Sequence, residues 1–300
     1  MMQIIVIYGG NSNEREVSLR SGERVAEALR CRGHRVACYD HVGGKLPIGF
    51  LQAAFAADAL FLALHGGEGE NGCLQARLTS CGIWHYTGSC PAGSAMAMAK
   101  SVARNLVAQA GIPVADGCLL KSDRAAPPFA FPLVVKPETG GSSIGMHIVK
   151  TPEEWQKLTP LRGMLCEKYL PGREFTVGVL NGRALPVVEI CPHGGVYDYR
   201  HKYRPGESRE RCPAPISDMR AGRMQEMAQR IFGILGLRDY ARMDFREDAD
   251  GIPCFLEANT LPGMTETSLF PLAAEAAGIP FAELCEKMAA MAAKRKRNRG

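Results

Sequence analysis

Three short strand-like segments in the first seventy residues constrain the fold of this chain more than any other feature. They occupy residues 4–8, 35–39 and 59–64, and the first and third are continuous apolar runs. Such runs are typical of parallel strands, which are buried on both faces, and residues 16–30 have the apolar spacing of a helix. We therefore predict an open parallel α/β sheet, with ligands beyond the carboxyl ends of its strands.

The rest of the chain divides into two further parts, with boundaries after residues 93 and 170. The small-residue segment PAGSAMAMAKSVARNLVAQAG begins at Pro91 and predicts a helix over 95–110 that ends at Gly111. Further elements are expected as strands at 133–136, 146–149, 164–169, 174–180 and 184–190, a short helix around Trp155, a helix over 219–235, and two last strands. We predict three domains: an N-terminal parallel α/β domain (1–93), a small central subdomain (94–170) and a C-terminal subdomain (171–300).

Composition narrows the class of protein. The chain has 300 residues, 46% of them hydrophobic, which is enough for two or three packed domains. No run approaches the roughly 20 apolar residues of a membrane span, and the start MMQIIVIYGG is typical of a first strand rather than a targeting segment. We expect a cytoplasmic protein without a membrane partner. Much of the net charge of +5 lies in the terminal KRKRNRG, so no nucleic-acid partner is expected either.

The pattern of cysteines also indicates a cytoplasmic protein. The eleven cysteines are scattered, without a Cys-x-x-Cys pair or a zinc-like Cys/His spacing. This favours reduced, mostly buried thiols, with a disulfide framework or a metal site as the alternative.

The segment from 240 to 259 carries the strongest chemical signal. Arg242 and Asp244 share one face of a strand, and Glu257 and Asn259 share one face of the next, because side chains alternate along a strand. The Asp-Gly turn at 250–251 predicts an antiparallel hairpin that brings Asp244, Glu257 and Asn259 together. Two carboxylates and an amide oxygen suit Mg²⁺ that bridges nucleotide phosphates. The alternative is an ordinary hairpin with a charged outer face.

A Pro-Gly turn follows this hairpin directly. Pro262 and Gly263 leave a backbone N–H that can point at a developing oxyanion, and Ser268 can hydrogen-bond a substrate carboxylate. By itself such a turn is more often structural.

A second signal is the segment VVKPETGGSSIG. A strand ends in Lys136, and a loop with Ser142 and Ser143 follows, whose N–H groups and hydroxyls can cover a triphosphate. The loop is not a Walker A motif, because the lysine precedes the glycines. Lys100 on the preceding helix is a second candidate phosphate cation. The alternatives are a flexible surface turn and a solvated lysine.

A weaker signal lies where the second and third predicted domains join. Glu167, Lys168, Tyr169 and Leu170 end one strand, and Glu174 starts the next. An extended linker of this kind can offer backbone hydrogen bonds to an adenine edge, and a carboxylate beyond it can hold ribose hydroxyls.

Two polar residues lie at the carboxyl ends of the N-terminal strands. Glu14 follows the first strand and can bind a substrate ammonium or complement a helix dipole, while Asn13 and Glu16 fit a capping box. His65 follows the third strand and precedes glycines. The first loop lacks the G-x-G-x-x-G spacing, which argues against a nicotinamide-dependent dehydrogenase.

A polar loop, Tyr-Asp-Tyr-Arg-His-Lys-Tyr over 197–203, crowds aromatic and cationic residues together. It can act as a lid that excludes water from a reactive intermediate. The alternative is a solvated surface loop.

These segments, in this order, closely resemble the D-alanine–D-alanine ligases of the ATP-grasp superfamily. The resemblance covers nearly the whole chain through EREVSL, ALHGG.GENG, YTGS, KP...GSSIGM, EK.LPGREFTV, YDY..KY, R.DF and EANTLPGMT..S. It implies a three-domain ATP-grasp fold and ligation of two D-alanines through an acyl phosphate, for peptidoglycan precursor synthesis. It also implies ATP and two Mg²⁺ ions, with Mn²⁺ as an alternative, and a homodimer.

The resemblance also implies roles for individual residues. ATP would be bound by Lys100, Lys136, Ser143, Glu167, Lys168, Leu170 and Glu174. The metal ligands would be Asp244, Glu257 and Asn259. The substrates would be bound by Glu14, His65, Lys202 and Ser268. Arg242 and the Gly263 N–H would stabilise the tetrahedral intermediate, and Glu14, Ser142 and Tyr203 would tie the lid to the N-terminal domain.

The resemblance also bears on the choice of substrate. Tyr203 favours D-alanine over D-lactate as the nucleophile, because family members that form depsipeptides carry a different lid there. The chain departs from the family pattern at Ala99, where an acid often precedes the lysine, and in short segments between Pro113 and Lys136 and near Trp155. The alternatives are an ATP-grasp ligase for other amino or hydroxy acids, or an inactive nucleotide-binding regulator.

Overall fold

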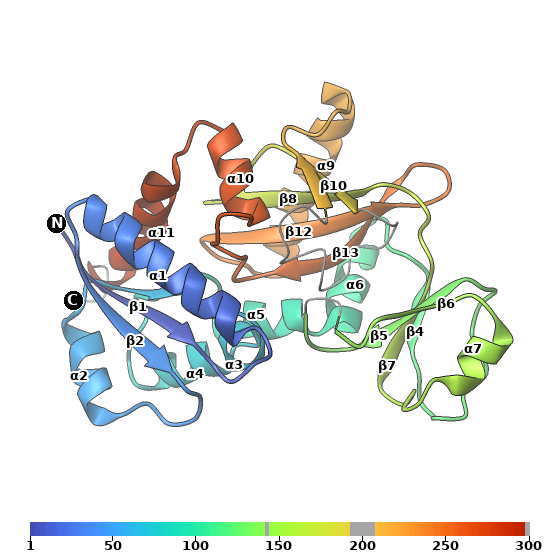
Figure 1. Cartoon of the computed structure of the whole chain (residues 1–300), viewed down its shortest axis with the longest axis horizontal. Helices are drawn as coiled ribbons and strands as arrows, with labels where there is room; N and C mark the ends of the chain where they lie inside the picture. Colours follow the sequence, from blue (N-terminus) through green and yellow to red (C-terminus); the bar gives the residue numbers. More distant parts are fainter. Residues whose placement is uncertain (142–143, 193–207, 298–300) are drawn as a thin grey trace.

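The computed structural model describes residues 1–141, 144–192 and 208–297, which form three sheets flanked by helices (Figure 1). In chain order the elements are β1 (Gln3–Gly9), α1 (Arg15–Cys31), β2 (Arg35–His41), α2 (Ile48–Ala56), β3 (Ala59–Leu62), α3 (Gly67–Glu70), α4 (Cys73–Ser80), α5 (Pro91–Met98), α6 (Lys100–Gln109), β4 (Gly117–Leu119), β5 (Leu133–Pro137), β6 (His147–Val149), α7 (Pro152–Lys157), β7 (Met164–Lys168), β8 (Glu174–Leu180), β9 (Arg183–Ala184), β10 (Val188–Pro192), β11 (Ser208–Arg211), α9 (Asp218–Ile234), β12 (Tyr240–Glu247), β13 (Pro253–Asn259), α10 (Leu269–Ala276) and α11 (Phe281–Arg297).

The N-terminal sheet is parallel, in the order β2-β1-β3. Its central strand β1 is buried on both faces, which explains the continuous apolar run in the sequence. The predicted α/β class is confirmed, and β3 ends at Leu62, two residues earlier than expected.

The last helix of the chain completes this N-terminal layer. Helix α11 packs against β3 and α1, so it lies beside the first strands in space (Figure 1). Arg295 of α11 pairs with the buried Asp239 at 2.7 Å, and its guanidinium also donates to the carbonyl groups of Trp84 and Tyr86. The two ends of the chain share one hydrophobic core. The domain boundaries predicted from the sequence stay a prediction.

The two remaining sheets are antiparallel. The small one has the order β4-β7-β5-β6 and encloses a core that includes Leu133, Val135 and Trp155. The large one has the order β11-β10-β8-β12-β13, with β9 on β8, and α9 packs against β8 and β12.

The β12–β13 hairpin forms as predicted. Asp244 lies directly opposite Glu257, and Arg242 lies opposite Asn259. The register shifts after Asp244, so that Leu256 is the extra residue of a β-bulge. Bulges redirect side chains near binding sites, and Leu256 lines a cleft beside the hairpin.

Three predictions of local structure are wrong. The helix expected over 95–110 is broken at Ala99, whose ψ of 93° separates α5 from α6. The expected capping box is absent, because α1 begins at Arg15 with Glu14 as its N-cap residue and no side-chain cap. The strand expected at 184–190 is divided between β9 and β10.

The expectation of mostly buried thiols is also wrong. Five of the eleven cysteines are exposed, and three are buried (Cys166, Cys254 and Cys285). All eleven are unpaired thiols. Among the described helices, none combines the length and the apolar character that a membrane crossing requires.

Candidate active site

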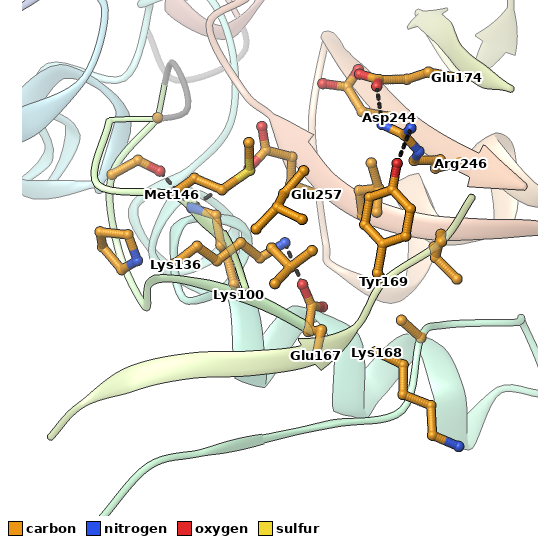
Figure 2. A pocket seen from close by; sticks show the side chains of 18 of the residues that line it. Lys100, Lys136, Met146, Glu167, Lys168, Tyr169, Glu174, Asp244, Arg246 and Glu257 are labelled. Carbon is orange, nitrogen blue, oxygen red and sulfur yellow. Dashed lines mark hydrogen bonds and ion pairs between the residues drawn. The ribbon is translucent and has the colours of Figure 1, made fainter. Parts of the chain in front are cut away.

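A cleft of about 930 Å³, part of it open to solvent, lies between the small sheet and the β12–β13 hairpin (Figure 2). We call it the nucleotide-sized cleft. Its lining brings together residues that the sequence singled out for ATP and metal binding, namely Lys100, Lys136, Glu167, Lys168, Leu170, Glu174, Asp244 and Glu257.

A buried charge cluster lies inside this cleft. Lys136 Nζ is 2.7 Å from one oxygen of Glu167, and Arg104 Nε is 2.8 Å from the other. Both side chains of the Arg104–Glu167 pair are about 95% buried. Two cations around one carboxylate leave a net positive charge, which favours an anion such as phosphate in the cleft.

Apolar side chains also line the cleft. Val134, Met146, Ile148 and Leu256 line it together with Leu170, which suits the flat face of a purine base. The Lys168 side chain leaves the cleft: its ammonium lies 2.7 Å from Asp116 and points away from the other labelled residues (Figure 2).

A second ion pair lies at the far end of the cleft. Arg246 of β12 donates to Glu174 at 3.1 Å and to the Tyr169 hydroxyl at 3.3 Å (Figure 2). The contact fixes the Glu174 carboxylate beside the linker that carries Tyr169. Glu174 lines the cleft at this end, and its hydrogen bonds to ribose stay a prediction.

The three predicted metal ligands converge on the hairpin. Asp244 and Glu257 are cross-strand partners, and Asn259 Nδ2 lies 3.0 Å from Asp244 Oδ2. Two carboxylates directly opposite each other repel, so the pair calls for a cation. Lys100 Nζ lies 3.5 Å from Glu257, and Arg242 pairs with Asp244 through Nε at 2.9 Å and Nη2 at 3.0 Å.

This donor set fits a divalent cation. Two carboxylates and an amide supply the hard oxygens that Mg²⁺ prefers, and each carboxylate lies beside a protein cation, Lys100 or Arg242. Thr176 Oγ1 also lies 2.6 Å from Asp244 Oδ1, so this carboxylate is held in place by donors on both oxygens.

Lys100 reaches the cleft because α6 begins there. Glu138 accepts hydrogen bonds from the Ser101 N–H at 3.2 Å and from its hydroxyl at 2.6 Å, so it caps α6 from a separate loop. The break at Ala99 therefore gives α6 its own start. It directs Lys100 toward the carbonyl of Gly140, 2.5 Å away, and toward Glu257.

A second cavity, of about 640 Å³, lies on the N-terminal side of the hairpin, and we call it the polar cavity. Its lining includes the predicted substrate and oxyanion residues Glu14, His65, Arg242, Asn259, Gly263 and Ser268, together with Glu70. The two cavities meet at β12, where Arg242 lines one and Asp244 the other.

Gly263 and Ser268 are in close contact at the edge of the polar cavity. A Cβ atom at Gly263 would lie 2.6 Å from Ser268 Oγ, so a larger residue there would force the serine hydroxyl to move. The Ser268 hydroxyl accepts from the Thr265 N–H at 2.9 Å. These contacts bring the Gly263 backbone and the Ser268 hydroxyl to one side of the cavity.

Burial determines the charge states in the polar cavity. Burial, reinforced by nearby Glu14, raises the pKa of Glu70 to about 8. Burial lowers the pKa of His65, whose ring lies 3.0 Å from Ser21 Oγ and 3.1 Å from the Leu261 carbonyl oxygen. Glu70 is therefore protonated and His65 neutral near pH 7.

Four predicted residues lie outside the described part of the chain: Ser142, Ser143, Lys202 and Tyr203. Their roles stay predictions, as does the lid.

Sequence reasoning missed several residues that shape both cavities: Ser21, Arg24, Glu70, Arg104, Thr176 and Arg246. Only Glu70 carried a signal, because it belongs to the glycine-rich segment after β3. The others look like ordinary helix or strand residues, and their contacts join distant segments.

Residues 106–290 match the protein family whose description is D-ala D-ala ligase C-terminus. The D-alanine–D-alanine ligase of Methylacidiphilum infernorum is 41% identical over 290 residues, which cover 95% of this chain and 93% of that protein. The ligase of Aquifex aeolicus is 40% identical over 296 residues, which cover 94% and 98%.

Solved structures give the same result. The D-alanine–D-alanine ligase of Bacillus anthracis has a TM-score of 0.85 at 31% identity and covers all of both chains. Its complex with ATP has a TM-score of 0.83 at 30% identity, over all of this chain and 99% of that one. The VanG D-Ala:D-Ser ligase of Enterococcus faecalis has a TM-score of 0.80 at 27% identity, over 97% and 99%.

The likeness extends over nearly the full length of both sequences, and the matching structures confirm the ATP-grasp arrangement of one parallel and two antiparallel sheets. This chain is a member of the D-alanine–D-alanine ligase family.

Proposed function

We propose that this enzyme joins two D-alanine molecules with ATP as the phosphoryl donor, to supply D-alanyl-D-alanine for peptidoglycan precursors. The observation that carries the proposal is the junction of the two cavities on β12. Arg242 lines the polar cavity and Asp244 the nucleotide-sized cleft, and a bidentate ion pair joins them. A phosphoryl group and an amino-acid carboxylate bound in these cavities would meet at that pair.

The first step is phosphoryl transfer to the first D-alanine. Its ammonium binds Glu14, which lies at the carboxyl end of β1 in the polar cavity. Its carboxylate attacks the γ-phosphorus of ATP, which yields an acyl phosphate and ADP. Lys100 and Lys136 balance the phosphate charge, and Glu174 and the linker at 168–170 bind the nucleoside.

The second step is aminolysis of the acyl phosphate. The second D-alanine, with its carboxylate at Ser268 and Lys202, attacks the carbonyl carbon as a free amine, and inorganic phosphate leaves. Arg242 and the Gly263 N–H stabilise the oxyanion of the tetrahedral intermediate. Asp244 holds the Nε and Nη2 edge of Arg242, which fixes the guanidinium plane at the junction.

Two Mg²⁺ ions, held by Asp244, Glu257 and Asn259 and replaceable by Mn²⁺, would neutralise charge on the transferred phosphate. Ser142 and Tyr203 would close the site against water together with Glu14. We also propose a cytoplasmic homodimer, which light scattering on the purified chain would test.

A substrate panel tests the proposal. Phosphate release and product mass are measured with ATP, D-alanine as first substrate, and D-alanine, L-alanine, D-serine or D-lactate as second. We expect D-alanine to give the highest kcat/KM. A higher value with D-serine, the substrate named for the VanG relative, or with D-lactate would instead support a ligase of different specificity. ATP binding without phosphate release for any pair would indicate an inactive regulator.

A further inference from the structure

The segment 261–264, here called the oxyanion loop, is held by side chains from the other end of the chain. The Met264 N–H donates to Ser21 Oγ at 3.3 Å, and Arg24 Nη1 donates to the Met264 carbonyl at 2.9 Å. On the other side of Gly263, the Leu261 carbonyl lies 3.1 Å from His65 Nδ1. Ser21 and Arg24 belong to α1, and His65 follows β3.

The chemistry of these groups fixes the direction of each hydrogen bond. A carbonyl oxygen can only accept, so His65 Nδ1 carries a proton and donates to Leu261. A neutral imidazole then has an unprotonated Nε2, which accepts from the Ser21 hydroxyl 3.0 Å away. That hydroxyl accepts in turn from Met264 N–H. The bonds form a circuit that leaves the oxyanion loop at Met264 and returns to it at Leu261.

We propose that Ser21 and His65 are positioning residues that set the direction of the Gly263 N–H through this circuit. The proposal rests on the proposed function, in which that N–H meets the oxyanion. His65 acts on the substrate through the loop, because both of its ring nitrogens already bind protein groups. Ser21 does not line the polar cavity, so removal of its hydroxyl can affect catalysis only through the oxyanion loop.

Two features distinguish the circuit from ordinary core packing. Ser21 and His65 are both buried, and burial lowers the pKa of His65, which keeps the ring in the neutral form that the circuit requires. Arg24 adds a second contact to the loop, and its guanidinium is fixed by the Phe281 ring, 3.7 Å from the ring centroid. The loop is therefore anchored on both sides of Gly263.

Helix α1 offers a matched control. Ser18 is as fully buried as Ser21 and lies one turn earlier. Its hydroxyl accepts from the Gly9 N–H at 2.8 Å and donates to the Ala63 carbonyl at 2.7 Å, so it joins β1 to the end of β3 and does not contact the oxyanion loop. Ser18→Ala and Ser21→Ala therefore remove the same group from the same helix, with different partners.

The first experiment measures kcat, the KM for ATP and thermal stability of both variants. We expect Ser21→Ala to lower kcat by about 10- to 100-fold, the range for a small displacement of a catalytic group. Its KM for ATP should stay within about twofold of wild type, because the nucleotide-sized cleft is separate. It should also weaken binding of a phosphinate analogue of the dipeptide, which mimics the tetrahedral intermediate. Ser18→Ala should lose comparable stability and less than about threefold in kcat. Equal kcat in the two variants would overturn the proposal.

The second experiment needs no variant. Nitrogen-15 spectra of the wild-type chain with labelled histidine should show His65 as the neutral Nδ1–H tautomer at pH 7. An Nε2–H tautomer or an imidazolium would overturn the proposal even if Ser21→Ala failed to fold. If the wild type preferred D-serine, the proposed substrate would be wrong. The tautomer and the difference between the serine variants would still support the circuit.

Discussion

The nucleotide-sized cleft and the polar cavity share the β12–β13 hairpin but are built in different ways. Apart from the hairpin, the lining of the cleft comes from residues 100–174, which include α6 and the small antiparallel sheet. The polar cavity combines Glu14, His65 and Glu70 with residues 242–269. The hydrogen bonds between its two parts span 191 to 243 residues.

Under the proposed function, the two cavities control different steps. Strand pairing within the small sheet would position the groups for ATP, whereas docking of the chain's two ends would position the groups for the amino acids. Changes in the polar cavity should therefore affect kcat with little effect on ATP binding, and changes in the cleft should do the reverse. Four predictions test this separation, from the largest expected effect to the smallest.

The two arginines of β12 give the sharpest test. Arg242→Ala removes the proposed oxyanion donor, and loss of such a donor typically costs about 3 to 4 kcal/mol, so phosphate release with D-alanine should fall by two to three orders of magnitude. ATP affinity, measured by equilibrium dialysis, should be retained. Arg246→Ala, four residues along the same strand and in the nucleotide-sized cleft, should instead raise the KM for ATP. A shared kinetic phenotype would show that the two cavities are not separate.

Lys136→Ala tests the cleft from its charged end. It removes one of the two cations around Glu167 and so the net positive charge. A charge-assisted hydrogen bond contributes about 1.5 to 3 kcal/mol, so ATP affinity should fall by about 10- to 100-fold. Lys121→Ala, an exposed lysine that does not line the cleft, is the control and should bind ATP normally. Unchanged ATP affinity in Lys136→Ala would contradict the assignment.

Glu70→Gln tests the polar cavity through pH. The native-state pKa of about 8 lies above the ordinary value of 4.5, so the folded chain keeps a proton that the unfolded chain has lost. Glu70 therefore makes the free energy of unfolding fall as pH rises from about 5 to 8, by up to about 1.4 kcal/mol per pH unit. Urea unfolding at several pH values should show this contribution in wild type and not in the variant. Parallel profiles would mean that Glu70 titrates normally.

Lys168→Ala should have the smallest effect. Its ammonium is about half exposed, pairs with Asp116 and points away from the cleft. Exposed ion pairs contribute about 0 to 1 kcal/mol, so the KM for ATP should change by less than about threefold. A change of tenfold or more would show that the side chain turns inward to bind the nucleotide.

Much of the nucleotide-sized cleft was predictable because its elements are local in sequence. The Asp-Gly turn and the alternation of side chains place Asp244 opposite Glu257. The segments that carry Lys136 and Glu167 are each predicted as strands, but their pairing is not, because β6 and α7 lie between them in the chain. The hairpin follows from hydrophobic period and turn chemistry, which a short segment encodes by itself.

The helix at 95–110 shows where local information fails. An alanine-rich segment has a high intrinsic helix propensity and gives no reason for a break. The break at Ala99 depends on Glu138, which caps α6 from a loop more than thirty residues away. Lys100 therefore reaches the cleft through a tertiary contact.

By itself, the sequence determined the parallel N-terminal sheet, the β12–β13 hairpin and the residue types that the proposed chemistry needs. Only the tertiary structure decided that Ser21, Arg24 and Glu70 support the oxyanion loop and that both ring nitrogens of His65 bind protein groups. The physical reason is that these hydrogen bonds form only after the two ends of the chain dock around one core. The two partners of each hydrogen bond are too far apart in sequence for a local pattern to predict the contact.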